Sequence, residues 1–346
     1  MNRRLFLGAT LLGAAAGAPL APAQQKIRAA LYGTRHSHAR GKLKAMLDSP
    51  HYELAGICEP DSSALAKSAD LATHRKLTEE QMLNDPGIQL IVVETPVWES
   101  MSYARKVIAA GKHLHLEKPP THEWKPFQDL IAEARRKQLL VQLGYIWRFH
   151  EGIGRAIGLA KSGTLGNVYL MRGTIHTNLG EDSRPPLARY KGGMMFELGC
   201  HLLDRTVDLF GRPKAVKSWL QKGATSKDEL ADNTLAVLEY DSALAVITTS
   251  ARMSGSSEHR SFEVIGDDGS VLIQPVEPGT KMRVNVRTAR GPYKAGWQEI
   301  DLPPQPRYTG DFRDLARAIQ TGTPLKYSYD FELLLQETIL RASQEL

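Results

Sequence analysis

The chain has 346 residues, of which 42% are hydrophobic and 24% charged, and its formal net charge is +6. This mild positive charge comes without a long basic run, which argues against a nucleic-acid partner. The length predicts two domains rather than one.

Residues 1–25 are predicted to be an export signal rather than part of the fold. Arg3 and Arg4 precede a mild apolar run rich in alanine and glycine, and Ala21-Pro22-Ala23 offers the small residues that signal peptidase reads. The paired arginines resemble a twin-arginine signal, with an ordinary secretory signal as the alternative. The run is too short to remain as a membrane anchor. We therefore expect a periplasmic or secreted protein that is exported already folded and holds its cofactor tightly.

From residue 26 to 147, short apolar strands alternate with amphipathic helices. Strands are predicted over 27–32, 53–58, 90–93, 113–116 and 139–143, and helices over 39–47, 100–110 and 124–137. This alternation is typical of a Rossmann domain, an α/β fold with a doubly wound parallel sheet. Ligands of such sheets bind at the carboxyl ends of the strands.

The loop after the first strand reads Gly33-Thr34-Arg35-His36-Ser37-His38. Of the dinucleotide fingerprint G-x-G-x-x-G it keeps only the first glycine, so the loop must have a different shape. Arg35 can act as a cation near the phosphates, at the positive end of the next helix. We expect Gly33, Thr34, Arg35 and His36 to contact the cofactor. A Rossmann-like domain without cofactor is the alternative.

The second strand ends at Glu59, 26 residues after Gly33, where a ribose-binding acid belongs. A carboxylate accepts both ribose hydroxyls and repels a 2′-phosphate, which favours NAD over NADP. The alternative is that Glu59 only begins the turn at Pro60.

Two later strand ends carry Thr95-Pro96 and Glu117-Lys118-Pro119, and a glycine-rich block ends in Glu197-Leu198-Gly199-Cys200-His201. In this order the motifs resemble the Gfo/Idh/MocA family of glucose–fructose oxidoreductase and inositol dehydrogenase. The resemblance covers nearly the whole mature chain. It implies that Thr95, Pro96, Glu117 and Lys118 contact the cofactor. It also places Lys118 and His201 at the family's catalytic positions, with Glu197 where the family usually has aspartate.

The same residues could oxidise a secondary alcohol. His201 can accept the hydroxyl proton, because its ordinary pKa is about 6.5. Glu197 lies four residues earlier, a spacing that would let it orient the imidazole or bind a substrate hydroxyl. Lys118 can polarise the developing oxyanion. Tyr145 and Arg148 are expected to line the cleft between the domains.

Residues 148–346 are predicted to form a substrate and oligomerisation domain. Strands are expected over 168–176, 216–220, 234–240, 245–249, 261–265 and 270–273. They predict an α+β domain with a large, mostly antiparallel sheet that helices cover on one face. The resemblance implies a homo-oligomer formed through the other face. Helices over 310–320 and 330–343 are expected to pack back on the first domain.

No metal site is predicted. His36 with His38, and His113 with His115, are pairs of two-residue spacing, but no C-x-x-C or H-E-x-x-H motif accompanies them. The two cysteines are expected to be free thiols, with Cys200 in a glycine-rich turn.

The expected function is an exported NAD-dependent oxidoreductase that acts on a sugar, polyol or glycoside. Two alternatives stay open. One is a redox-neutral glycosidase or lyase, which some relatives of the family are. The other is a carbohydrate-binding protein without catalysis.

Overall fold

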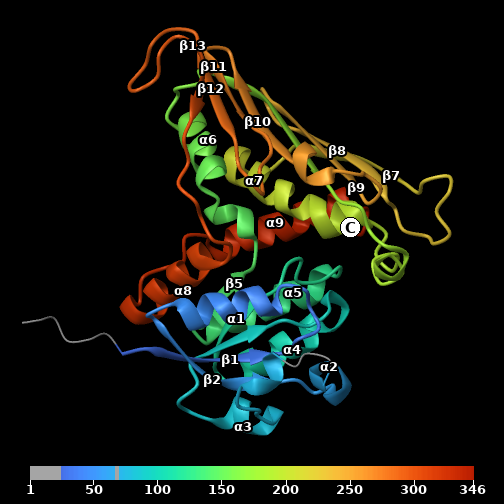
Figure 1. Ribbon diagram of the computed structural model, residues 1–346, viewed down its shortest axis with the longest axis vertical. Helices are drawn as coiled ribbons and strands as arrows, with labels where there is room; N and C mark the ends of the chain where they lie inside the picture. The colour runs from blue at the N-terminus through green and yellow to red at the C-terminus, as the bar shows by residue number, and fades with distance from the viewer. Residues whose placement is uncertain (1–24, 67–69) are drawn as a thin grey trace, which may run out of the picture.

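The computed structural model describes residues 25–66 and 70–346. The predicted export signal lies almost entirely outside these residues. Two sheet domains are stacked along the long axis of the molecule, with α8 and α9 running between them (Figure 1). Across the described parts of the chain, no helix has the length and apolar character needed to cross a membrane.

The first domain is a five-stranded parallel sheet in the order β2-β1-β3-β4-β5. Its strands are β1 (Ile27–Tyr32), β2 (Tyr52–Cys58), β3 (Leu90–Val93), β4 (His113–Leu116) and β5 (Val141–Leu143). Its helices are α1 (Ala39–Asp48), α2 (Ser62–Ala66), α3 (Glu79–Asn84), α4 (Val97–Ala109) and α5 (Trp124–Arg136). The chain winds to one side of β1 for β2 and to the other side for β3. This reversal opens a crevice at the carboxyl ends of β1 and β3, so the predicted Rossmann sheet is confirmed.

The second domain is an eight-stranded sheet in the order β13-β12-β11-β10-β6-β9-β8-β7. Its strands are β6 (Val168–His176), β7 (Ala215–Gln221), β8 (Asn233–Glu239), β9 (Leu244–Ser250), β10 (Ser261–Gly266), β11 (Gly269–Ile273), β12 (Met282–Val286) and β13 (Gly296–Ile300). Every neighbouring pair is antiparallel except β6 and β9, which confirms the mostly antiparallel sheet. The sequence patterns did not predict β12, β13 or α6 (Glu151–Lys161).

Helices α6 and α7 (Cys200–Phe210) pack against one face of this sheet. Cys200 therefore begins a helix and does not lie in a turn as expected, although both cysteines are free and buried. None of the helices that the structure describes covers the other face. Trp219 on β7 and Trp297 on β13 are each more than half exposed there.

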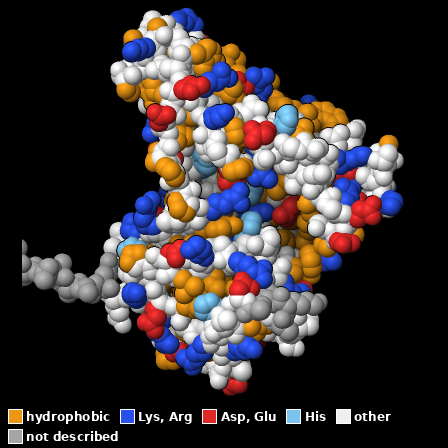
Figure 2. Space-filling view, in the orientation of Figure 1, with side chains coloured by type: hydrophobic (Ala, Val, Ile, Leu, Met, Phe, Trp, Pro, Cys, Tyr) orange, Lys and Arg blue, Asp and Glu red, His pale blue; other side chains and the backbone are white. Residues whose placement is uncertain are grey.

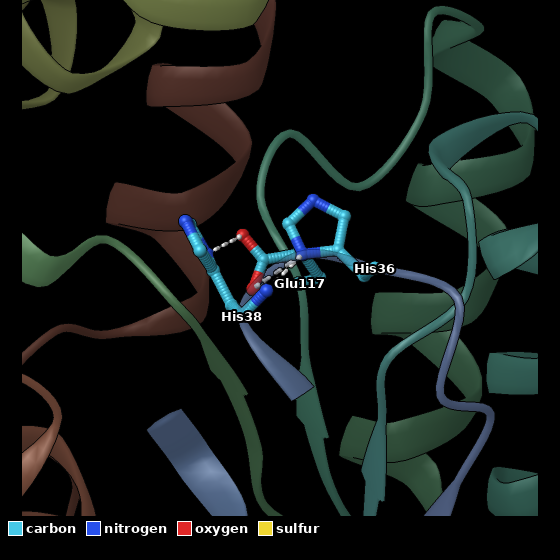
Figure 3. Close-up of side chains that lie close together, drawn as sticks. All are labelled: His36, His38 and Glu117. Carbon is cyan, nitrogen blue, oxygen red and sulfur yellow. Dashed lines mark hydrogen bonds and ion pairs between the residues drawn. The ribbon is translucent and has the colours of Figure 1, made fainter. Parts of the chain in front are cut away.

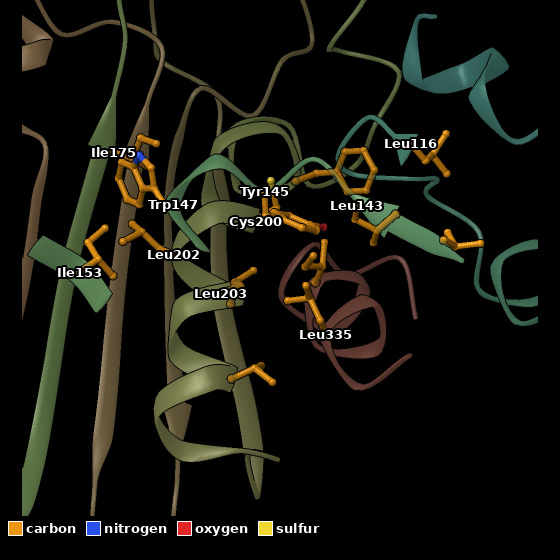
Figure 4. Close-up of a cluster of buried hydrophobic side chains, with 14 of the residues drawn as sticks. Leu116, Leu143, Tyr145, Trp147, Ile153, Ile175, Cys200, Leu202, Leu203 and Leu335 are labelled. Carbon is orange, nitrogen blue, oxygen red and sulfur yellow. The ribbon is translucent and has the colours of Figure 1, made fainter. Parts of the chain in front are cut away.

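One hydrophobic core runs through both domains. Leu116 and Leu143 at the ends of β4 and β5 lie in the same cluster as Leu203 of α7 and Ile175 of β6 (Figure 4). Leu335 of α9 (Tyr329–Ala342) completes this cluster between the two sheets. Each fully buried side chain of this size contributes about 1.5–3 kcal/mol. The domain boundary is therefore packed as closely as a domain interior.

The last two helices tie the chain back to the first domain. Helix α8 (Thr309–Thr321) packs against α1 and β1, and the Tyr52 hydroxyl donates a 2.6 Å hydrogen bond to the Phe312 carbonyl. Helix α9 packs against α5 of the first domain and α7 of the second.

Candidate active site

The crevice between β1 and β3 depends on a glycine. Gly33 has a φ of +85°, and a Cβ there would lie 2.5 Å from Cγ2 of Thr95 at the end of β3. Only glycine combines this backbone conformation with this contact. Gly33 and Thr95 were both predicted to bind the cofactor, and the structure brings them together. Pro96 follows directly, at the N-terminus of α4.

The carboxylate of Glu59 lies beside the same loop. Its Oε2 accepts hydrogen bonds from the Thr34 backbone N–H at 2.6 Å and the Thr34 hydroxyl at 3.0 Å. Its Oε1 accepts one from the Asp61 N–H at 2.9 Å. Glu59 thus supports the turn, and a carboxylate with three donors keeps acceptor capacity for a ribose hydroxyl.

Arg35 forms an ion pair with Glu99 in the first turn of α4. The sequence did not predict Glu99 as the partner of Arg35. The pair holds the guanidinium at the rim of the crevice, where about a quarter of the side chain is exposed.

Lys118 connects the two domains. It follows β4, and its Nζ donates hydrogen bonds to both the carbonyl and the Oε1 of Glu197, each at 3.1 Å. Burial of Lys118 opposes the charged form, but the Glu197 carboxylate outweighs it and the pKa of Lys118 is raised. The site therefore contains a permanent buried ammonium ion.

No hydrogen bond or ion pair joins Glu197 to His201 in the described residues, so the pairing that the four-residue spacing suggested is not seen. Residues Met195–Gly199 form a π-helix that leads into α7. A π-helix bonds i to i+5, so the four-residue spacing of a regular helix no longer puts both side chains on one face. The Glu197 carboxylate points to Lys118 instead.

His201 lies in the first turn of α7, with only 3% of its surface exposed. Its Nδ1 is buried and has no hydrogen-bond partner among the described residues. Burial, and next the charge of Lys118, hold the pKa of His201 well below its ordinary value. A neutral imidazole next to a fixed ammonium can accept a proton from a substrate hydroxyl.

Tyr145 and Trp147 surround this imidazole. The Tyr145 ring meets His201 edge-on at 6.0 Å, and the Trp147 ring lies 5.8 Å away. The Tyr145 hydroxyl is buried and has no partner within the described ranges. Tyr145 therefore stays a candidate for contact with substrate or for proton transfer.

Arg148 has a different place from the one expected. Its side chain is 1% exposed, and its guanidinium bonds to Asp204 of α7 at 2.8 Å and to both oxygens of Glu332 of α9. Each of the three guanidinium nitrogens has a carboxylate partner inside the protein. Arg148 therefore joins two helices below the site and does not line the cleft.

A second polar cluster was missed in part. Glu117, Glu94 and Lys42 are all fully buried, and the Lys42 ammonium bonds to both carboxylates. His36 and His38 face Glu117 from the loop after β1 (Figure 3). The sequence of α1 did contain a sign of this cluster, because Lys42 interrupts the otherwise apolar stripe of residues 39, 43 and 46 that the helix buries.

The prediction of no metal site rested on the lack of a metal-binding motif beside the histidine pairs, but the fold brings Glu117 to His36 and His38 as a third potential ligand. His113 and His115, the other histidine pair, do not share a ligand site, because each has its own partner. His115 bonds to Asp311 at 3.3 Å, while His113 accepts a hydrogen bond from the Leu140 N–H.

A cavity of about 650 Å³ adjoins the site on one side. It lies between η2 (Ile146–Phe149) and the loops around residues 277–280 and 302–311. Trp147 and Tyr308 line it, and they contact His201 and His38 respectively. Basic and histidine side chains gather where the two domains meet on this face (Figure 2).

The class of protein follows from these positions. An ammonium ion and a neutral imidazole stand at the carboxyl edge of a sheet of the dinucleotide-binding kind, which is the arrangement required to remove a proton and a hydride from one alcohol carbon. Gly33, Thr34 and Glu59 retain the room and the acceptor that a dinucleotide needs. This combination of fold and site is typical of nicotinamide-dependent oxidoreductases.

Comparison with known families agrees. The model of the oxidoreductase family with an NAD-binding Rossmann fold matches residues 27–145, and that of the GFO/IDH/MocA C-terminal domain matches residues 155–272. Together they cover more than half of the chain, which belongs to the GFO/IDH/MocA family. Its first domain is an NAD-binding Rossmann domain.

Individual relatives are distant. The oxidoreductase YhhX of Escherichia coli (strain K12) is 28% identical over 228 residues, which is 64% of each chain and so less than two thirds of YhhX. The scyllo-inositol 2-dehydrogenase (NADP(+)) IolW of Bacillus subtilis (strain 168) is 25% identical over 70% of this chain and 66% of its own. The aldose–aldose oxidoreductase of Caulobacter crescentus, solved with glycerol, has the same fold, with a TM-score of 0.78 at 22% identity over 93% of this chain and 98% of that one.

Proposed function

We propose that this protein is an exported oxidoreductase that uses tightly held NAD to oxidise a secondary alcohol of a sugar, polyol or glycoside. The observation that supports it most directly is the Lys118–Glu197 pair beside the unpartnered imidazole of His201. The names of an inositol dehydrogenase and an aldose–aldose oxidoreductase among its relatives point to the same substrate class.

The chain's own residues carry the proton chemistry. Bound NAD supplies the acceptor for the hydride. Lys118 donates a hydrogen bond to the reacting oxygen and stabilises the negative charge that develops there. His201 accepts the hydroxyl proton, and Glu197 holds the ammonium of Lys118 in place. The Tyr145 ring packs edge-on against the His201 imidazole and helps to hold it in place.

The substrate class can be tested on protein purified without added nucleotide. We expect reduction of the bound NAD by one set of free sugars or polyols. Nitrophenyl glycosides test the alternative. Release of nitrophenol without net reduction of the bound NAD would replace this proposal with a redox-neutral cleavage. Absence of both reactions, together with no bound nucleotide, would favour a carbohydrate-binding protein.

Tight cofactor retention is a separate expectation. An exported enzyme has no free nicotinamide pool to draw on, so NAD should be released when purified protein is denatured. Added NAD at a hundred times its dissociation constant should stabilise stripped protein by about 2.7 kcal/mol. If no nucleotide is released and the melting temperature does not change, the cofactor claim is wrong.

Export is tested by fractionation. Replacing Arg3 and Arg4 together with lysine should leave the protein in the cytoplasm if the twin-arginine route carries it. Continued export of this variant would assign an ordinary secretory route. Cytoplasmic location of the unaltered chain would refute export altogether.

We further propose that two copies associate through the uncovered face of the eight-stranded sheet. That face presents the apolar side chains of Trp219, Leu235 and Val246 on the neighbouring strands β7, β8 and β9. Leu272 on β11 and Trp297 on β13 lie on the same face, beyond the Arg172–Glu263 ion pair. Exposed apolar patches of this kind mark contact surfaces. Trp219→Glu should lower the mass measured by light scattering, whereas Lys125→Glu, at an exposed position of α5 in the first domain, should not.

A further inference from the structure

The cluster beneath the loop between β1 and α1 has the geometry of a ligand set. Nδ1 of His38 lies 3.1 Å from Oε1 of Glu117, and Nδ1 of His36 lies 3.8 Å from Oε2 of Glu117. One ligand atom from each of the three residues lies within 4.8 Å of the other two. Figure 3 shows both rings turned toward the carboxylate from opposite sides.

Nδ1 of His38 can donate a proton to Glu117 or, without that proton, ligate a metal ion. The His38 backbone N–H donates a 3.3 Å hydrogen bond to Nδ1 of His36. A metal ion would replace that hydrogen bond at the lone pair of this nitrogen. The same nitrogen stands 3.6 Å from Oε2 of Glu94, a buried oxygen without a hydrogen-bond partner in the described part of the chain. A buried carboxylate oxygen without a donor is costly unless a cation lies nearby.

The ammonium of Lys42 neutralises only part of the negative charge in this cluster. Its Nζ is 2.5 Å from Oε1 of Glu94 and also bonds Oε2 of Glu117. One ammonium faces two fully buried carboxylates, so with neutral imidazoles a negative charge is left uncompensated. The Glu117 oxygen that faces His38 is not used by Lys42.

We propose that His36, His38 and Glu117 bind a divalent first-row transition-metal ion, with zinc as the reference ion. Two imidazole nitrogens and one carboxylate oxygen suit such ions, and three protein ligands leave a position open. Lys42 would then orient the ligating carboxylate through a hydrogen bond, as partners of metal ligands commonly do. The histidine side chains are 13% and 20% exposed, so an ion can reach them from the crevice.

The ion would take over a task that glycines perform in the dinucleotide fingerprint. His38 occupies the position of the glycine that lets helix and strand pack closely, and a shared metal would fix the loop to β4 instead. It would also add positive charge at the end of α1, beside the expected pyrophosphate position. A proton on one of the histidines is the competing occupant.

The experiment uses untagged protein purified with its own cofactor, so that no affinity tag contributes histidines. We expect about one equivalent of metal per chain by elemental analysis. Protein stripped with a chelator should take up one equivalent of Co²⁺ with the visible absorption of a four- or five-coordinate site, and Zn²⁺ should displace it. His38→Ala and Glu117→Gln should each weaken Co²⁺ binding at least tenfold.

His51→Ala is the matched control, because His51 precedes β2 at the opposite edge of the sheet, and it should bind Co²⁺ like the unaltered chain. The proposal would be overturned if the spectrum showed hydrated Co²⁺ alone, or if all three variants bound Co²⁺ equally. If a variant fails to fold, the spectrum of the unaltered protein decides alone. NAD content is measured in the same samples, so that loss of the cofactor claim and loss of the metal claim are told apart.

Discussion

Replacing Lys118 with methionine removes the ammonium ion while keeping most of the side chain's volume. The lost ion pair has an Nζ–Oε1 distance of 3.1 Å, which at an effective dielectric constant of about 20 is a gross attraction of about 5 kcal/mol. Most of this is offset, because the buried ammonium no longer has to be desolvated and Glu197 is 17% exposed. We therefore expect little change in stability. Turnover should fall by about 10²–10³, since a donor to the developing oxyanion is lost.

The assay measures kcat and NAD affinity with a substrate identified in the sugar and polyol screen. A double variant, Lys118→Met with Glu197→Gln, should restore any lost stability without restoring turnover. Lys125→Met, on an exposed residue of α5, is the control and should be silent. If Lys118→Met keeps more than a tenth of the original kcat with unchanged NAD binding, the proposed role of the ammonium is wrong.

Three further variants test other parts of the structure. Glu59→Ala should raise the Kd for NAD more than that for NADP, and equal changes would make Glu59 purely structural. Because the pKa of buried His201 is held low, the unfolded chain takes up a proton below about pH 6.5 that the folded chain does not. The free energy of unfolding should therefore decrease as the pH is lowered below about 6.5, by up to about 1.4 kcal/mol per pH unit from this group. His201→Gln should reduce this pH dependence in denaturant titrations. Arg148→Met should cost about 3–5 kcal/mol, since Asp204 and Glu332 lose their partner, and an unchanged melt would contradict the buried-network interpretation.

The Rossmann sheet was predictable because its buried strands are continuous apolar runs between amphipathic helices. The strand ends were predictable for the same reason, and Gly33, Glu59, Thr95 and Lys118 all lie at one edge. Strands β12 and β13 were missed because polar residues such as Arg283 and Glu299 occupy their exposed positions and weaken the apolar pattern, although Gly291-Pro292 marks a turn between them.

The errors within the site arise from packing that spacing cannot express. Four residues separate Glu197 from His201, but the π-helix rotates one against the other. Arg148 follows an aromatic cleft motif, yet its partners Asp204 and Glu332 come from helices far along the chain. Glu117 joins His36 and His38 only because β4 and the loop after β1 end at the same edge.

The core that runs unbroken from β4 through α7 and α9 to β6 limits how this protein can be re-engineered. A chimera joined between the two domains would place Leu116 and Leu143 against a surface shaped for other side chains. The cofactor half is thus not an interchangeable module. New specificity would have to come from grafted loops, such as residues 277–280 and 302–311 around the adjoining cavity, which leave that core intact.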